Sequence, residues 1–175
     1  MAITRSRRPI AGDRIAATTR RLLDASPLCA IATVDRRGRP YVNTAYFAWT
    51  PAFALVWLSE PRARHSANIR ANDSAAVAVY DSRQTWGMPD RGIQVFGTAT
   101  RIRGSAAHEF ERAYAERFPD YAPADVPAYR VYVLHAERLK LFDENELGAG
   151  VFVTARVGRD RRPVWERTDV YAAAD

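Results

Sequence analysis

The residues best suited to chemistry lie at a junction between an apolar and a polar segment in the first half of the chain. Residues 55–58 are apolar, the run stops at Ser59, and a proline two positions later favours the start of a helix. Arg64, His65 and Ser66 follow. The first turn of a helix offers unpaired N–H groups and the positive end of the helix dipole. Guanidinium, imidazole and hydroxyl groups at that point predict a phosphate-binding cradle; the alternative is a solvated turn that carries arginines.

Other reactive residue types form no recognisable catalytic or metal-binding pattern. Cys29 lies inside an apolar segment and is interpreted as a small buried hydrophobe. His108 and His135 have no partner at metal-ligand spacing, so no metal site is predicted. The sequence has neither a Gly-x-Ser-x-Gly motif nor a paired-carboxylate pattern that would indicate a hydrolase. No catalytic side chain is therefore assigned.

The length and composition indicate one globular domain. The chain has 175 residues, of which 47% are hydrophobic and 26% are charged. No apolar run approaches the roughly 20 residues that a membrane-spanning helix needs. The N-terminus lacks the apolar core of a secretory signal, and one cysteine excludes an internal disulfide. We therefore expect a cytoplasmic protein without a membrane partner.

The net charge of +6 is concentrated near the N-terminus. Residues 1–21 hold six arginines and one acid, a net of +5, and residues 156–175 hold five arginines and four acids, a net of +1. Residues 22–155 are therefore electrically balanced. Because this central part has no basic stripe with interleaved aromatic residues, nucleic acid is not an expected partner.

The pattern of apolar residues predicts a mainly β chain with flanking helices (α+β). A helix capped by Asp13 is expected over residues 13–25, after a mobile lead-in over residues 1–12. A second helix follows the polar junction and ends near Asn72, and a third begins at Ser105. The expected strands are residues 28–34 and 40–49, joined by a turn at 35–38, then 53–58, 75–80, 93–102, 129–134 and 138–142. About six strands with hairpin spacing predict an antiparallel, closed or nearly closed barrel.

In this order the segments resemble the pyridoxamine 5'-phosphate oxidase-like family, the FMN-binding split barrels. The resemblance covers about residues 22–143. It is carried by Cys29-Ala-Ile-Ala-Thr33, Arg39-Pro-Tyr-Val-Asn-Thr44, the Arg-His-Ser-x-Asn-Ile pattern within residues 58–69, Ala76-Val-Ala-Val79 and Ile93-Gln-Val-Phe-Gly-Thr-Ala99.

The resemblance implies a homodimer with two flavin sites in the clefts between subunits. It divides the chain into a basic N-terminal arm with the start of the first helix (1–21), a flavin-binding split-barrel domain (22–143) and a C-terminal tail (144–175) that contacts the partner subunit. The residues that would bind FMN by position are Ser59, Arg64, His65 and Ser66 at the phosphate, Asn43, Thr44 and the backbone of Ala45 along the isoalloxazine ring, Gln94 as a hydrogen-bond partner, and Trp165 reaching the neighbouring subunit's flavin. His65 stands where many family members have lysine, so its charge depends on pH. Trp86, in a loop, is a candidate cover for the flavin face.

The implied function is that of a flavin-dependent oxidoreductase that transfers hydride to or from a small or planar substrate. Oxidation of vitamin B6 is not expected, because the true oxidases use a C-terminal Arg-x-His pair and residues 156–175 contain no histidine. Two alternatives stay open. One is a reductase that uses the deazaflavin F420, with Arg36, Arg37 and Arg39 near its anionic tail. The other is a non-catalytic protein that binds flavin or haem, the latter through His65, His108 or His135.

Overall fold

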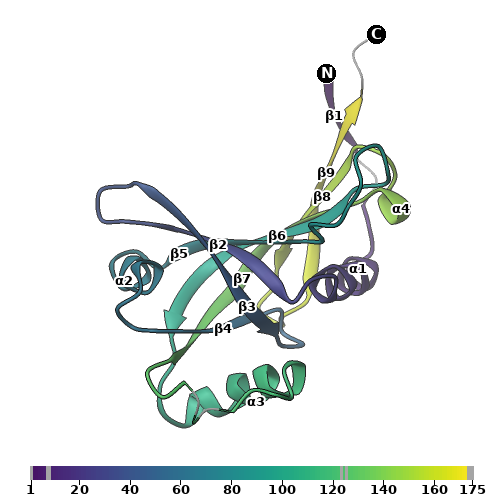
Figure 1. Cartoon of the computed structure of the whole chain (residues 1–175). Coiled ribbons are helices and arrows are strands. Elements are labelled where there is room, and N and C mark those ends of the chain that lie inside the picture. Colours follow the sequence, from purple (N-terminus) through teal and green to yellow (C-terminus); the bar gives the residue numbers. More distant parts are fainter. Residues whose placement is uncertain (1, 7–8, 123, 125, 173–175) are drawn as a thin grey trace. The chain divides into compact units, whose positions relative to one another are not determined.

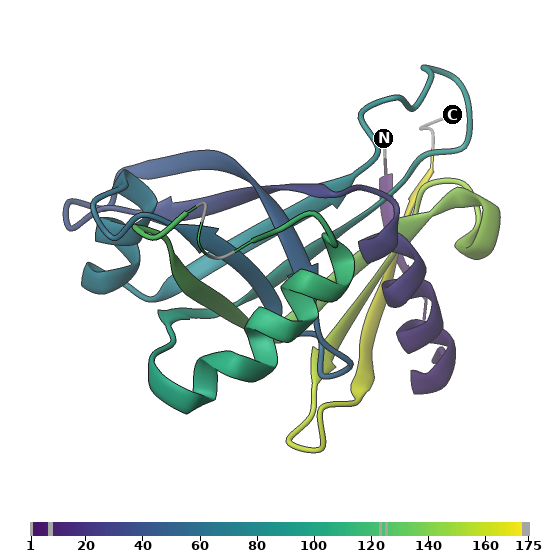
Figure 2. The same ribbon diagram turned by 60° about the horizontal axis from the view of Figure 1, so that its bottom comes forward.

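The computed structural model describes residues 2–6, 9–122, 124 and 126–172 (Figures 1 and 2). The chain forms two compact units, each described by itself. The barrel unit consists of Pro27–Val77 and Phe96–Ala136. The terminal unit consists of the residues up to Ser26, Ala78–Val95 and the residues from Glu137 on.

The described residues form mainly strands, with short helices between them. The strands are β1 (Ala2–Ser6), β2 (Leu28–Val34), β3 (Pro40–Trp49), β4 (Leu55–Ser59), β5 (Ser74–Tyr80), β6 (Arg91–Arg101), β7 (Arg130–Asp143), β8 (Val151–Val157) and β9 (Pro163–Ala172). The helices are α1 (Gly12–Asp24), α2 (Arg64–Ala71), α3 (Ala107–Arg117), preceded by a 3₁₀ turn at Gly104–Ala106, and α4 (Glu144–Leu147).

Six of the strands close into an antiparallel barrel. Their order is β7-β4-β3-β2-β5-β6, and β6 pairs with β7 to complete the ring. The predicted fold class, a mainly β split barrel with flanking helices, is confirmed. Closure leaves no edge strand in the ring, but the ladder between β3 and β4 is short and extends only from Phe47–Trp57 to Trp49–Leu55.

The hairpin of β2 and β3 follows the sequence prediction closely. Leu28 pairs with Tyr46 and Val34 with Pro40, and the predicted turn lies between the two strands. Gly38 has a φ of 77°, a left-handed conformation that glycine adopts without steric cost, and its N–H donates to the Asp35 carbonyl at 2.9 Å. A turn of this kind fixes the register, and the register decides which side chains face the barrel interior.

Helix α3 covers β3 and β4 through an apolar cluster, and Figure 2 shows it lying along these strands. The cluster consists of Ala48, Ala54, Val56, Ala107, Tyr114, Val131 and Val133, with Leu58, Ile102, Phe110, Phe118 and Tyr121 packed at its margin. Helix α2 packs on β2, where the buried side chain of Asn68 donates a hydrogen bond from Nδ2 to Thr33 Oγ1 at 3.1 Å. The two helices therefore have fixed positions on the barrel strands.

The terminal unit differs most from the sequence predictions. The N-terminal segment that was expected to be a mobile lead-in contains β1, which pairs with β9, and the C-terminal tail forms β8 and β9, which pair with each other. The two strands expected at residues 129–134 and 138–142 are one continuous strand, β7, whose second half pairs with β8. Polar residues interrupt β1 and β9, so their pattern is weak until pairing supplies backbone hydrogen bonds, whereas β8 is largely apolar and rich in valine, a strand pattern that the prediction of a polar tail overlooked.

The first helix begins one residue earlier than predicted, and Asp13 does not cap it. Ala11 occupies the N-cap position without a side-chain hydrogen bond, and Asp13 lies in the first turn, where its charge suits the helix dipole. A Cβ at position 12 would lie 2.6 Å from the Pro163 carbonyl oxygen. Because the backbone lies this close to β9, only glycine fits at position 12 without a shift of the chain. The predicted face of Ile15, Thr19, Leu22 and Leu23 is buried, as expected.

Candidate functional site

A cavity of the barrel unit, which we call the main cavity because it holds most of the predicted site residues, opens where β3 and β4 separate. The two strands pair only between Phe47–Trp49 and Leu55–Trp57. Beyond this short ladder they diverge, and the next residues of each strand line a cavity of about 440 Å³. Its lining residues are Asn43, Thr44, Ala45, Tyr46, Leu58, Ser59, Glu60, Ala63, His65, Tyr114, Tyr121, Val126 and Tyr129. This volume lies within the range of small-molecule sites.

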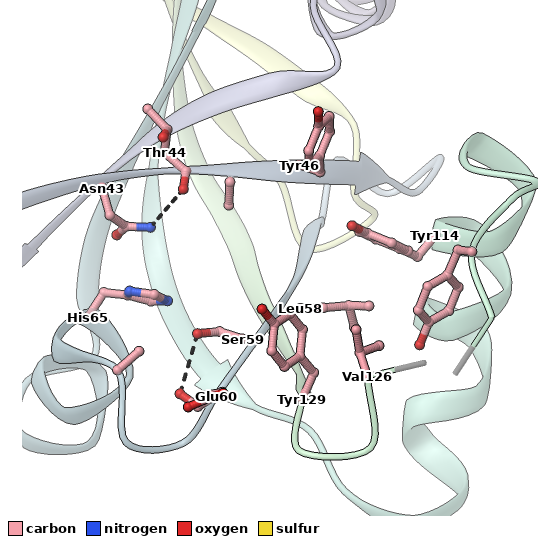
Figure 3. Close-up of a pocket in the computed structure, with 13 residues that line it drawn as sticks. Asn43, Thr44, Tyr46, Leu58, Ser59, Glu60, His65, Tyr114, Val126 and Tyr129 are labelled. Carbon is pink, nitrogen blue, oxygen red and sulfur yellow. Dashed lines mark hydrogen bonds between the residues drawn. The ribbon is translucent and has the colours of Figure 1, made fainter. Parts of the chain in front are cut away.

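The alternation of β3 directs particular backbone groups into this opening. Phe47 donates its N–H to the Pro27 carbonyl on the β2 side at 3.2 Å. In an antiparallel ladder, successive residues direct their N–H and C=O groups to opposite sides. Ala45 therefore directs its backbone toward β2, where it pairs with Cys29, while Thr44 and Tyr46 direct theirs toward the open edge. The Thr44 carbonyl already accepts from Asn43 Nδ2 at 3.4 Å (Figure 3), so the backbone groups left for a ligand are the N–H groups of Thr44 and Tyr46 and the Tyr46 carbonyl, while Ala45 contributes its side chain to the lining.

The first turn of α2 forms one wall of the cavity. The helix begins at Arg64, three residues after the proline, and its N-cap is Ala63, which makes no capping hydrogen bond through its side chain. The first N–H groups of the helix therefore have neither an intrahelical acceptor nor a side-chain cap. Ser66 is fully buried and donates to Ser59 Oγ at 3.2 Å. Ser59 in turn donates to the Glu60 carbonyl at 3.3 Å.

Two buried polar atoms at this end of the cavity lack hydrogen-bond partners among the described residues. They are Asn43 Oδ1 and His65 Nε2. Figure 3 shows both side chains at the same end of the cavity, close to Ser59 and Glu60. Burial lowers the pKa of His65, so its imidazole is neutral near pH 7. A buried polar atom without a partner costs free energy, and such atoms in a cavity indicate a place where a ligand completes the hydrogen bonding.

The opposite end of the cavity is aromatic and apolar. Its side chains come from β3, β4, α3 and the connection between α3 and β7, and they are Tyr46, Leu58, Tyr114, Tyr121, Val126 and Tyr129, of which Tyr129 extends furthest toward Ser59 (Figure 3). We refer to these six residues as the tyrosine end. None of them was predicted as a site residue. The three proline residues of the α3–β7 connection indicated a stiff segment. The sequence did not indicate that the tyrosines of this segment would lie beside β3.

Arg64 and His65 lie in different cavities, although they are neighbours in the sequence. Arg64 is exposed and lines a second cavity, of about 370 Å³. Four further arginines line it: Arg36, Arg37, Arg39 and Arg70. Asp35 is the carboxylate among its lining residues, and this group is already bound by Arg39, with an N–O distance of 2.8 Å. The second cavity is therefore strongly basic.

The remaining predicted site residues belong to the terminal unit and do not line the main cavity. Gln94 is exposed on β6. Trp165, on β9, is partly buried and donates from Nε1 to Thr168 Oγ1 at 3.0 Å. Trp86 lies in the loop between β5 and β6 and is fully exposed. In contrast, Asn43, Thr44, Ala45, Ser59 and His65 line one cavity, with Ser66 directly behind Ser59.

Several other kinds of site find no support in the described part of the chain. Histidine, cysteine and acidic side chains do not gather there in groups of three that could hold a metal ion. Cys29 is buried, and burial raises the pKa of its thiol to about 12, so it is an inert thiol. None of the helices in this part of the chain has the length and apolarity needed to cross a membrane.

Solved structures of known proteins share this fold. A pyridoxamine 5'-phosphate oxidase-related, FMN binding protein from Nostoc punctiforme superposes with a TM-score of 0.62 at 14% identity, covering 91% of this chain and 94% of its own. A heme binding protein from Mycobacterium smegmatis has a TM-score of 0.58 at 14% identity, covering 97% and 91%. An F420 reductase has a TM-score of 0.53 at 24% identity, covering 68% and 93%. At these identities the likeness establishes the fold alone.

The sequence comparison is more specific. None of the curated protein sequences matches the chain. The sequence profile described as pyridoxamine 5'-phosphate oxidase, however, matches residues 15–143, which include every residue that lines the main cavity. The split barrel, the cavity at its open seam and this match agree, and the chain belongs to the pyridoxamine 5'-phosphate oxidase family.

Proposed function

We propose that this protein is a flavin-dependent oxidoreductase that binds FMN in the main cavity. The observation that carries the proposal is the pair of unpartnered buried atoms, Asn43 Oδ1 and His65 Nε2, beside the uncapped first turn of α2. Asn43 Oδ1 can accept a hydrogen bond from the flavin ring, and His65 Nε2 can bind the flavin phosphate. Membership of the family and the fold shared with an FMN binding protein support the same cofactor.

The residues of the cavity fit the hydrogen-bonding groups of FMN. The imide edge of the flavin ring has one N–H and two carbonyls, so Asn43 Oδ1 would accept from the N–H and the backbone N–H groups of Thr44 and Tyr46 would donate to the carbonyls. The phosphate would lie at the first turn of α2, near Ser59 and His65. When bound, FMN supplies a ring that can accept or donate a hydride. The protein holds this ring and keeps water away from it.

Arg64 would reach the phosphate from the other side of the same helical turn. Its exposed side chain is long, and its planar guanidinium can bind two phosphate oxygens at once. His65 would gain a proton when a dianion binds beside it, because a nearby negative charge favours the imidazolium form. The first turn would therefore supply both a fixed cation and one that depends on pH.

The working form would be a homodimer. The outer face of the β2–β3 hairpin carries exposed apolar side chains, with Leu28 at 42%, Val42 at 61% and Tyr46 at 56% exposure. These residues lie on one face of the sheet, because Leu28 pairs with Tyr46 and Val42 lies four residues from Tyr46 on β3. Exposed apolar side chains on one face, interrupted by Thr44, favour burial of this face against a second copy of the chain.

The substrate would be a small or planar molecule and not a vitamin B6 vitamer. The C-terminal strands β8 and β9 occupy the region in which the oxidases carry their Arg-x-His pair, and residues 151–172 contain no histidine. The redox partner must therefore be recognised by other groups.

The absorption spectrum of the purified protein tests the proposal. We expect a yellow protein with a flavin band, or a colourless one that acquires the band and a higher melting temperature when FMN is added. Reduction by dithionite should bleach the band and air should restore it. A protein that neither carries flavin nor binds added FMN would overturn the proposal.

The deazaflavin F420 is the second candidate, and the basic second cavity is the observation that favours it. F420 has an anionic tail longer than that of FMN, and Arg36, Arg37 and Arg64 lie on one concave surface without an ion-pair partner among the described residues. The same spectrum and titration decide between the cofactors, because the F420 band lies at shorter wavelength than that of FMN. A Soret band would instead indicate haem, the cofactor named for one protein of the same fold.

A further inference from the structure

We propose that the tyrosine end of the main cavity binds the second reactant, and that this reactant is a planar, uncharged aromatic compound with carbonyl oxygens, such as a quinone. The proposal rests on the function proposed above, because it assigns the polar end of the cavity to the cofactor. It adds the chemical class of the molecule with which that cofactor would react.

The tyrosine end is built from interlocked rings. Tyr114 packs against Tyr121 edge to face, with ring centres 5.2 Å apart and an interplanar angle of 78°. Tyr114 also lies 4.8 Å from Phe118, and Tyr46 packs edge to face on Phe118 at 5.6 Å. Because each ring holds the next, the aromatic wall has a defined shape. Aromatic rings in such a wall favour a flat aromatic ligand through stacking and edge contacts.

Backbone hydrogen bonds hold the connection that carries part of this wall. Tyr121 donates its N–H to the Phe118 carbonyl at 2.9 Å, and Tyr129 donates to the Val126 carbonyl at 2.9 Å. The Arg130 guanidinium donates to the carbonyls of Pro127 and Tyr129 at 2.8 and 2.6 Å. Both ends of the connection therefore have set positions, so the wall is largely formed before a ligand binds.

The charges around the cavity exclude an anionic reactant. Among the described residues that line it there is no lysine or arginine, the carboxylate is Glu60, and His65 lies at the polar end, where any charge it gains would face the FMN phosphate. An anion at the tyrosine end would lose its hydration without gaining a counter-charge. The Arg130 guanidinium, beside Tyr129, already donates to the carbonyls of Pro127 and Tyr129, and a cluster of five arginines lies around the second cavity. An uncharged ligand incurs no such cost.

The hydroxyl of Tyr114 supplies a hydrogen-bond donor for a carbonyl oxygen. The side chain is buried, with 8% of its surface exposed, and it lines the cavity. Burial, followed by the influence of Tyr121 and Tyr46, raises the pKa of Tyr114 to about 12, so the hydroxyl keeps its proton at physiological pH. A tyrosine that cannot ionise remains a donor, and this favours a carbonyl-bearing ligand over a simple hydrocarbon.

Calorimetry tests the proposal with two probes, 2-methyl-1,4-naphthoquinone and its sulfonated anionic analogue. The affinity of each probe is measured for the FMN-loaded protein and for the cofactor-free protein. We expect the neutral quinone to bind both forms and the anionic analogue to bind at least about tenfold more weakly. Tyr114→Phe should weaken quinone binding about 2- to 10-fold, which is the worth of one hydrogen bond, and leave the FMN affinity unchanged.

Two further variants distinguish quinone binding at the tyrosine end from nonspecific hydrophobic binding. Tyr129 is 42% exposed, so Tyr129→Ala should fold normally and weaken quinone binding about tenfold. Tyr80, on β5, is 51% exposed and does not line the cavity, so Tyr80→Ala is the matched control and should have no effect.

The outcomes distinguish this proposal from the function on which it rests. If FMN binds and the quinone does not, the substrate class is wrong and the cofactor assignment stands. The same conclusion follows if Tyr114→Phe and Tyr129→Ala leave the quinone affinity unchanged. If FMN displaces the quinone, the ring of FMN occupies the tyrosine end and the proposal is overturned. If the quinone binds and FMN does not, the tyrosine end is supported and the flavin function is refuted.

Discussion

Ser66 donates a hydrogen bond to Ser59 over an oxygen–oxygen distance of 3.2 Å, and this bond joins the first turn of α2 to the last residue of β4. Both side chains are buried. The bond holds the start of the helix against the end of the strand, so the free N–H groups of that turn have a set direction before any ligand arrives. Preorganised donors of this kind bind an anion without the cost of ordering a loop.

Arg64→Ala should weaken FMN binding by about 1.5–3 kcal/mol, the usual worth of a hydrogen bond to a charged group. Fluorescence titration of FMN measures the effect. Arg62→Ala is the matched control, because Arg62 is exposed two residues earlier and lines neither cavity. Equal losses in both variants would indicate a general effect of positive charge and would remove Arg64 from the site.

Glu60→Gln should strengthen FMN binding, by up to about 1 kcal/mol at low salt. The Glu60 side chain lines the cavity next to Ser59, where the phosphate would lie, and two negative charges repel each other. The gain should shrink as salt is added, because the pair is exposed to screening. Weaker binding by the variant would contradict this account and would assign Glu60 to a hydroxyl of the ligand.

The stability of the cofactor-free protein should fall as the pH drops below about 6.5, the ordinary pKa of histidine. Burial lowers the pKa of His65, so the unfolded chain takes up a proton at a higher pH than the folded one. The contribution of the neutral imidazole is complete above 6.5 and is lost as the pH falls toward the lowered pKa of the folded state.

Thermal unfolding across this pH range measures the effect, and His65→Gln should flatten the profile. His108, which is exposed on α3, supplies the control: His108→Gln should keep the slope of the parent protein. Identical slopes in all three proteins would show that His65 does not titrate differently in the folded state.

Val42→Asp should convert the proposed dimer to a monomer, because it buries a carboxylate in an apolar interface. Sedimentation at micromolar concentration measures the mass. Val164→Asp is the control, since Val164 is 40% exposed but lies on β9 in the terminal unit. A parent protein that sediments as a monomer and still holds FMN would contradict the proposed assembly.

Asn68→Ala should destabilise the protein by about 1–3 kcal/mol, because it leaves Thr33 Oγ1 without its buried donor. Chemical denaturation measures the loss. The double variant with Thr33→Val should recover part of it, since neither polar group then remains buried without a partner. Strictly additive losses would show that the hydrogen bond does not couple α2 to β2.

The sequence predicted the hairpin of β2 and β3 to the residue, because local rules determine it. Leu28–Val34 is a short apolar run that ends at turn residues, and Gly38 supplies the left-handed turn. The junction at Ser59 was also a local pattern, so its serines and histidine could be named before the structure. Where the pattern was weak, as along β1 and β9, only pairing between distant segments defines the strands.

The tyrosine end was invisible to sequence reasoning for the same reason. Tyr46, Tyr114 and Tyr129 are far apart in the chain and carry no shared motif, and only the closure of the barrel brings them to one cavity. The separation of Arg64 from His65 has a different cause. Successive helical residues differ by about 100° around the axis, so neighbours in the sequence face different cavities.

The short ladder between β3 and β4 has a consequence for the protein without its ligand. From Tyr46 back to Val42, the outward N–H and C=O groups on alternate residues of β3 have no strand beside them. An unpaired strand edge is a template onto which another chain can add. A ligand that filled the cavity would also shield this edge, so the empty protein should be more prone to pair with a second chain than the filled one.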